Sequence, residues 1–80
     1  MTDFRELDTV VLTHDIPDAG LCAGDIGAVV HLYAAGDVEV EFVTASGHTQ
    51  AVMTLRPEDV RLARDDELLS VRPVGRQGAA

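Results

Sequence analysis

Hydrophobic and polar residues alternate in short runs along most of the chain between Asp8 and Leu62. An alternation with a period of two is typical of β-strands that bury one face. The runs are rich in valine, and they are separated by clusters of glycine, aspartate, serine and proline, which favour turns. The pattern predicts five strands, at residues 9–13, 25–33, 37–45, 48–55 and 60–62.

Two tight turns predict how the three central strands pair. A three-residue loop at 34–36 that ends in a left-handed glycine gives three apolar pairs, namely Ala28–Phe42, Val30–Val40 and Leu32–Val38. A two-residue turn at 46–47 gives three more, namely Phe42–Ala51, Val40–Met53 and Val38–Leu55. In this register Val30 faces the core, whereas the pairs Val29–Glu41 and His31–Glu39 lie on the outer face.

The last part of the predicted sheet includes a short helical element. Arg56-Pro57-Glu58-Asp59 predicts a 3-10 turn before the last strand. Five short strands, a long first loop and this turn predict an all-β fold, a small SH3-like five-stranded antiparallel barrel over residues 1–64. Gly27 indicates a bulge or bend in its strand. Residues 65–80 are expected to form a C-terminal extension, with one helical turn near 65–69 and then a mobile tail.

Composition narrows the classes of function. The 80 residues suffice for one domain, and 14 acidic against six basic residues give a formal net charge of −8. Such a charge disfavours nucleic acid as a partner, because phosphate backbones are bound by clustered lysine and arginine. No signal-peptide or membrane segment is visible, so a cytoplasmic location without membrane contact is expected. The single Cys22 cannot form an internal disulfide.

Two motifs in the first half of the chain resemble those of a known family. They are Phe4-Arg5-Glu6-Leu7-Asp8-Thr9-Val10-Val11-Leu12 and Gly24-Asp25-Ile26-Gly27-Ala28-Val29-Val30. Their order and spacing, an E-L-D-T-V-V-L … G-D-x-G-x-V-V pattern, resemble a bacterial family of small domains of unknown function, family 4926, over about residues 4–62. The resemblance implies an SH3-like β-barrel and no established activity.

The G-D-x-G-x-V-V segment is also similar to the start of KOW modules and other SH3-like barrels, found in ribosomal and transcription factors and in accessory subunits of enzymes such as nitrile hydratase. KOW modules hold nucleic acid with basic loops. The corresponding loops here carry acids instead, namely Asp15, Asp18, Asp25 and Asp37. The segment is equally well explained by turns and core packing.

No group of residues has the spacing of an established catalytic or metal site. His14, His31 and His48 supply possible metal ligands, but they lie on separate predicted elements and match no zinc motif. Thr13-His14-Asp15 has the residue types of a catalytic triad, yet neighbours on a strand point to opposite faces. We therefore expect neither enzymatic activity nor a cofactor, and a metal-binding small barrel stays open only as a second alternative.

The outer face of the central strands is the predicted partner-binding surface. Its candidate residues are Val29, His31, Glu39, Glu41, Val43, Gln50 and Val52, with Tyr33 and the loop at 16–22 as a competing site. The expected partner is another protein, of basic character, and the chain would act as an antitoxin-like or immunity-like protein or as an accessory subunit. A KOW-like nucleic-acid-binding protein is the first alternative, and a homodimer is also open.

Overall fold

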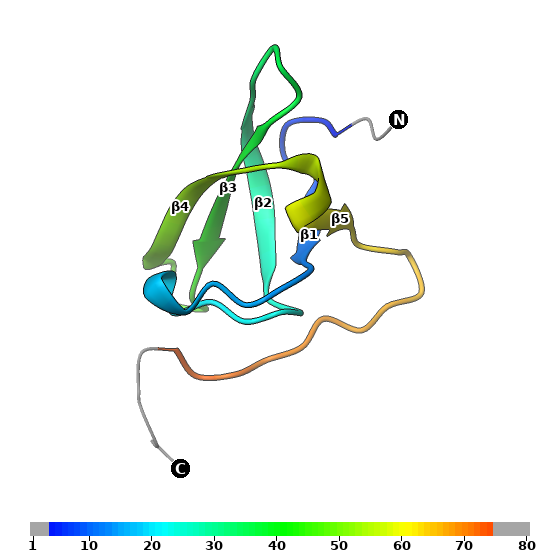
Figure 1. The fold of residues 1–80 in the computed structure, drawn as a ribbon. Helices are drawn as coiled ribbons and strands as arrows, with labels where there is room; N and C mark the ends of the chain where they lie inside the picture. Colours follow the sequence, from blue (N-terminus) through cyan, green and yellow to red (C-terminus); the bar gives the residue numbers. More distant parts are fainter. Residues whose placement is uncertain (1–3, 75–80) are drawn as a thin grey trace.

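The computed structural model describes residues 4–74 and contains a single sheet of five antiparallel strands (Figure 1). The elements in chain order are β1 (Thr9–Leu12), the 3-10 turn η1 (Pro17–Ala19), β2 (Ile26–Leu32), β3 (Val38–Val43), β4 (Thr49–Leu55), the 3-10 turn η2 (Pro57–Asp59) and β5 (Val60–Leu62). The strand order is β4-β3-β2-β1-β5, so β4 and β5 are the two edges. The all-β class, the five strands and the 3-10 turn before the last strand are confirmed.

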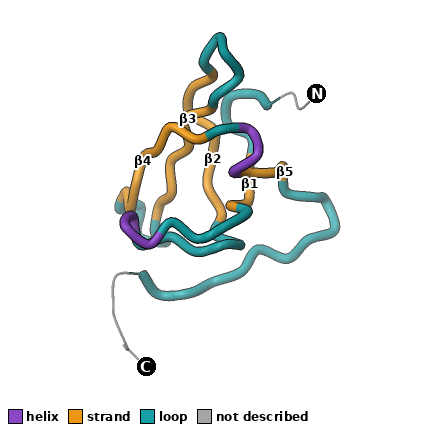
Figure 2. Tube along the Cα trace, in the orientation of Figure 1, coloured by secondary structure: helices purple, strands orange, loops and turns teal. Residues whose placement is uncertain are grey.

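The core lies on one face of this curved sheet and consists mainly of valine and leucine. Five side chains are the largest that are fully buried, namely Val10, Leu12, Val29, Val38 and Val40. Phe4, Leu21, Phe42, Leu55 and Val60 complete the cluster. No polar side chain is buried among residues 4–74, so apolar contact between residues brought together by the turns stabilises the domain. Outside the five strands and the two 3-10 turns, the described chain is loop (Figure 2).

The predicted register of β3 and β4 is confirmed, although the turn between them differs. Val38 pairs with Leu55, Val40 with Met53 and Phe42 with Ala51. The turn has three residues rather than two, because Thr44 N donates to His48 O at 2.8 Å and Gly47 has a φ of 90°. A register shift after Phe42 leaves Gln50 without a pairing partner and restores the expected pairs.

The predicted register of β2 and β3 is correct only next to the hairpin. Leu32 pairs with Val38 and His31 with Glu39, as expected. Beyond them a bulge leaves Val30 without a partner, so Val29 pairs with Val40 and Ala28 with Glu41. The prediction that Val30 faces the core and Val29 the outer face is therefore wrong: Val29 is 0% exposed and Val30 is 36% exposed.

Gly27 lies on the core side of β2, but the bulge is at Val30. A Cβ atom on Gly27 would lie 2.6 Å from Val40 Cγ1 and 3.0 Å from Phe42 Cδ2. Real Cβ atoms essentially never approach other atoms as closely as the first of these distances. The glycine is thus needed because side chains of the neighbouring strand β3 fill the space that a side chain here would take.

The C-terminal extension contains a turn and otherwise irregular chain. Glu67 N donates to Arg64 O at 3.1 Å, and no helix forms at 65–69, so the expected helical turn is a single hydrogen-bonded turn instead. In Figure 1 the extension leaves β5 and runs back past the start of β2 toward η1. The predicted mobile tail falls partly on 75–80, which lie outside the described residues.

The bulge makes a prediction about two neighbouring valines. Val29→Asp places an unpaired carboxylate in the core, which costs several kcal/mol, comparable with the roughly 5 kcal/mol total stability of a small domain. Val30→Asp places the same charge at a half-exposed position and should cost no more than about 1 kcal/mol. Urea unfolding followed by circular dichroism should show Val29→Asp unfolded in water and Val30→Asp folded. The reverse order would show that the bulge is misplaced.

Candidate functional site

The outer face is the sheet surface opposite the core, and its residues form two rows across the strands. One row runs through Thr9, Ala28, Glu41 and Val52, from β1 to β4. The second row runs through His31, Glu39 and Thr54. Thus the structure brings together His31, Glu39, Glu41 and Val52, as the sequence pattern predicted.

Exposed valines flank Glu41 on this face. Val43 lies two residues along β3 and is 54% exposed, and Val52 lies directly across on β4 and is 48% exposed. Glu41 Oε2 accepts a hydrogen bond of 2.7 Å from Thr49 Oγ1, so its carboxylate leans over β4. No salt bridge within residues 4–74 involves Glu41 or Glu39. The outer face therefore combines apolar side chains with carboxylates that no cation of the described part of the chain compensates.

Three of the predicted site residues lie elsewhere or have other roles. Val29 lies in the core, so it is not part of the outer face. Gln50 is the unpaired residue of β4, and its side chain donates to Ala19 O at 3.3 Å, which ties β4 to the loop around η1. Tyr33 lies at the β2–β3 hairpin, where its ring meets the His31 ring edge-on at 4.6 Å and its hydroxyl donates to Glu39 Oε1 at 3.4 Å.

The competing site of Tyr33 and the loop at 16–22 is not assembled. β2 begins beside that loop and ends at the hairpin, so the two features lie at opposite ends of the sheet (Figure 1). The loop is instead closed on itself, because Ile16 pairs with Leu21 in an isolated bridge. Tyr33 therefore belongs with the outer-face row of His31 and Glu39.

The C-terminal extension is fastened to the sheet at two points, the first of which is Glu67. The Arg61 guanidinium on β5 donates to both Glu67 carboxylate oxygens, at 2.9 and 2.7 Å, and Arg64 N donates to Oε1 at 2.7 Å. The hydrogen bonds from Arg61 and then from the Arg64 amide lower the pKa of Glu67 from 4.5 to about 2. Glu67 thus stays charged over the ordinary range of pH.

Arg72 makes the second anchor. Its Nε donates to Asp25 Oδ1 at 2.8 Å and its Nη2 to Asp25 Oδ2 and, at 2.9 Å, to Gly20 O. Cys22 N also donates to Asp25 Oδ2, at 2.8 Å. Burial raises the pKa of Asp25, but the hydrogen bonds from Arg72 and Cys22 lower it by more, so it lies below 3.8. Neither anchor was expected from the sequence.

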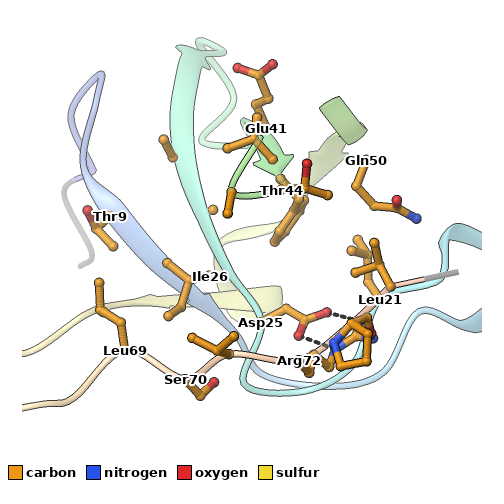
Figure 3. Close-up of a pocket in the computed structure, with 18 residues that line it drawn as sticks. Thr9, Leu21, Asp25, Ile26, Glu41, Thr44, Gln50, Leu69, Ser70 and Arg72 are labelled. Atoms are coloured by element: carbon orange, nitrogen blue, oxygen red, sulfur yellow. Dashed lines mark hydrogen bonds and ion pairs between the residues drawn. The ribbon is translucent and has the colours of Figure 1, made fainter. Parts of the chain in front are cut away.

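Between the extension and the sheet lies a cleft of about 570 Å³ (Figure 3). Ile26, Ala28 and Val43 line it from the outer face, and Leu69 and Val71 from the extension. Leu69 faces Ile26 in Figure 3, and the Asp25–Arg72 pair lies between Ser70 and Leu21 along the cleft. On the extension, Leu68 and Val71 are 97% and 96% exposed. The extension therefore both covers part of the outer face and adds apolar surface of its own.

The residues that the sequence offers for catalysis or metal binding are not brought together. His14 pairs with Asp59, His31 lies against Tyr33, and His48 is in the β3–β4 turn. Within residues 4–74, no three His, Cys, Asp or Glu side chains are grouped so that they could hold a metal ion. Thr13 Oγ1 donates to Glu58 O at 3.0 Å, whereas Asp15 Oδ1 accepts from Ala23 N at 2.8 Å, so the Thr13-His14-Asp15 groups face different partners. Cys22 is free and exposed.

The His14–Asp59 contact instead joins the loop after β1 to η2. His14 Nε2 lies 2.8 Å from Asp59 Oδ1, and Arg56 N donates to Asp59 Oδ2 at 2.9 Å. The hydrogen bond to Asp59 raises the pKa of His14 above 6.5. Burial raises the pKa of Asp59, but the hydrogen bonds from His14 and Arg56 outweigh it and hold the pKa below 3.8.

None of the helices among residues 4–74 is long and apolar enough to cross a membrane.

Residues 6–62 match the model of a family described as Domain of unknown function (DUF4926). The chain belongs to this family. The match covers all five strands and both 3-10 turns but not Glu67 and Arg72. The DUF4926 match thus contains the whole sheet and ends before the anchored extension. No curated protein and no solved structure matches the chain significantly.

The His14–Asp59 pair makes stability depend on pH. The share from protonated His14 is full below pH 6.5 and is lost as pH rises through its raised pKa, whereas the share from ionised Asp59 is full above pH 3.8 and is lost as pH falls through its lowered pKa. His14→Gln should therefore lower the urea midpoint most between pH 3.8 and 6.5. Equal losses at pH 5 and above about pH 9 would show that the pairing is not ionic.

The Arg72 anchor can be tested through the mobility of the extension. Arg72→Gln removes the charged fork, so backbone order parameters at 69–74 should fall from about 0.85 to below about 0.6 by nuclear magnetic resonance relaxation. Asp25→Asn should have a similar effect, because Asp25 is the other half of the pair. Arg72→Lys, which keeps the charge but not the fork, serves as the control for charge alone. An extension equally ordered in wild type and Arg72→Gln contradicts the anchor.

Proposed function

We propose that this DUF4926 domain is a non-enzymatic protein-interaction module that binds a basic protein through its outer face. The observation that carries the proposal is the placement of Glu41 between the exposed Val43 and Val52, with no cation paired to it among the described residues. Uncompensated carboxylates beside exposed apolar groups suit a partner that supplies arginine or lysine next to its own apolar residues.

The wider charge distribution supports the same choice of partner. The chain carries a formal net charge of −8, and arginines on β5 and the extension are already paired with Glu67 and Asp25. A net negative field steers basic partners toward the surface and repels nucleic-acid phosphates. Both an antitoxin-like or immunity-like protein and an accessory subunit would use such a surface, and either role fits this proposal.

We also propose that the domain is a small barrel of SH3-like type. The five short antiparallel strands, the long loop after β1 and the 3-10 turn before β5 support it. The side chains of Thr13, His14 and Asp15 are all engaged with η2 or with the first loop, which supports a binding role over a catalytic one.

The test compares two charge reversals that change the net charge equally. Glu41→Lys alters the outer face, and Glu58→Lys alters the exposed η2 on another part of the molecule. With partners cross-linked in the cells that make the protein, we expect Glu41→Lys to reduce recovery of the main partner about tenfold, equivalent to about 1.4 kcal/mol, and Glu58→Lys to leave it unchanged.

Two results would contradict the proposed function. Equal losses from both variants would assign the effect to net charge rather than to the outer face. Binding of the wild-type chain to bulk RNA or DNA at micromolar concentration, weakening steeply with added salt, would favour the nucleic-acid alternative instead.

A further inference from the structure

β4 is an edge strand whose protection against pairing with another chain is limited to the bulge at Gln50, near its start. It has seven residues, Thr49–Leu55, and none of them is charged or proline. Edge strands are normally shortened, charged, interrupted by proline or covered, because their free N–H and C=O groups bind other strands. At about 3.3 Å per residue, β4 offers roughly 23 Å of such backbone.

The opposite edge shows the contrast. β5 has only three residues, carries Arg61 and is preceded by η2 with its proline. The turn containing Glu67 is held against Arg61 by two hydrogen bonds. β5 is therefore protected by length, by charge and by the C-terminal extension, whereas β4 has none of these.

The free side of β4 is also uncovered by any other strand in the described structure. It pairs only with β3, and no strand lies on its other side in Figure 1. The loop around η1 touches it only near the start, through the hydrogen bond from Gln50 to Ala19 O. Val52 and Thr54, toward the other end, are exposed.

The charges beside the edge select the kind of strand that fits. The Glu41 carboxylate leans over β4 toward Thr49, so it lies within reach of a long side chain on an added strand, about 4.8 Å beyond β4. Arginine or lysine on the outer side of that strand would meet Glu41, and the apolar residues that alternate with them would lie on the core side, next to Ala51 and Met53. A second copy of this chain would present its own β4, which carries no arginine or lysine and would leave Glu41 without a cation.

We propose that β4 accepts an extended basic segment of the partner as a sixth strand, with main-chain hydrogen bonds along Thr49–Leu55 and arginine or lysine facing Glu41. This inference rests on the proposed function and adds to it the mode of binding. Main-chain pairing supplies affinity in such complexes, and alternate side chains supply specificity.

The test uses a synthetic peptide of about seven residues with alternating arginine and valine, matched to the length of β4 and capped at both ends. Nuclear magnetic resonance of the labelled full chain, saturated with this peptide, should show exchange of the free-side amides of β4 slowed about tenfold, equivalent to about 1.4 kcal/mol. A peptide of alternating glutamate and valine should give no protection. The arginine peptide with alternate N-methylated amides should lose it too, because it cannot form the ladder.

The matched variants are Val52→Lys on β4 and Val43→Lys on β3, which change the net charge equally. Val52→Lys should abolish protection of the β4 amides, since a lysine on the edge strand both blocks pairing and repels the basic peptide. Val43→Lys should retain the protection and weaken binding only modestly.

The outcomes separate the two proposals. Peptide-induced shifts at Glu41 and Val43 without β4 protection would overturn strand addition and leave the outer-face interaction standing. Failure of the basic peptide to bind at all, together with unchanged partner recovery in Glu41→Lys, would overturn both. Protection of β4 without peptide, in a sample that sediments as a dimer, would make a second copy the occupant and overturn the basic-segment proposal.

Discussion

The bulge at Val30 determines which side of β2 faces the core, and much of the domain depends on it. Because Val30 has no partner on β3, Val29 pairs with Val40 and packs inward. Gly27 then falls on the same side, where the contact with Val40 leaves no room for a side chain. As a consequence Ala28 lies on the outer face and lines the cleft that the C-terminal extension covers. The inner and outer faces of β2 up to Val29 are thus set by one unpaired residue.

The sequence predicts most of the sheet, and it fails at β2 for a physical reason. β3 alternates valine and phenylalanine with glutamate, so its two faces are marked by polarity, and its register with β4 is correctly predicted even though the turn is one residue longer. In β2 the run Ala28-Val29-Val30 is apolar throughout, so no polar residue marks a face. A register that continues without a break from the correctly predicted Leu32–Val38 pair therefore misses the bulge. It wrongly places Val29 on the predicted binding surface.

The anchored extension could not have been predicted from one sequence. Asp25 and Arg72 are 47 residues apart, and nothing in the local pattern around either residue indicates a partner. Asp25 has the expected role of a turn residue as well, since its carboxylate accepts the amide of Cys22. The cleft arises only when Arg72 and Glu67 fasten the extension across the outer face, so its existence follows from tertiary contacts and not from any motif.

Six of the 14 acidic residues form two groups that differ in their hydrogen-bond partners. Asp8, Asp25, Asp59 and Glu67 each accept a hydrogen bond from the amide three residues earlier, so their charges stabilise turns. Glu39 and Glu41 accept only hydroxyl groups, from Tyr33 and Thr49. A hydroxyl leaves the charge of a carboxylate in place, whereas a guanidinium compensates it. In the complex that we propose, the attraction for a basic partner is therefore concentrated on the outer face next to the uncharged edge of β4, where main-chain hydrogen bonds remain to be made.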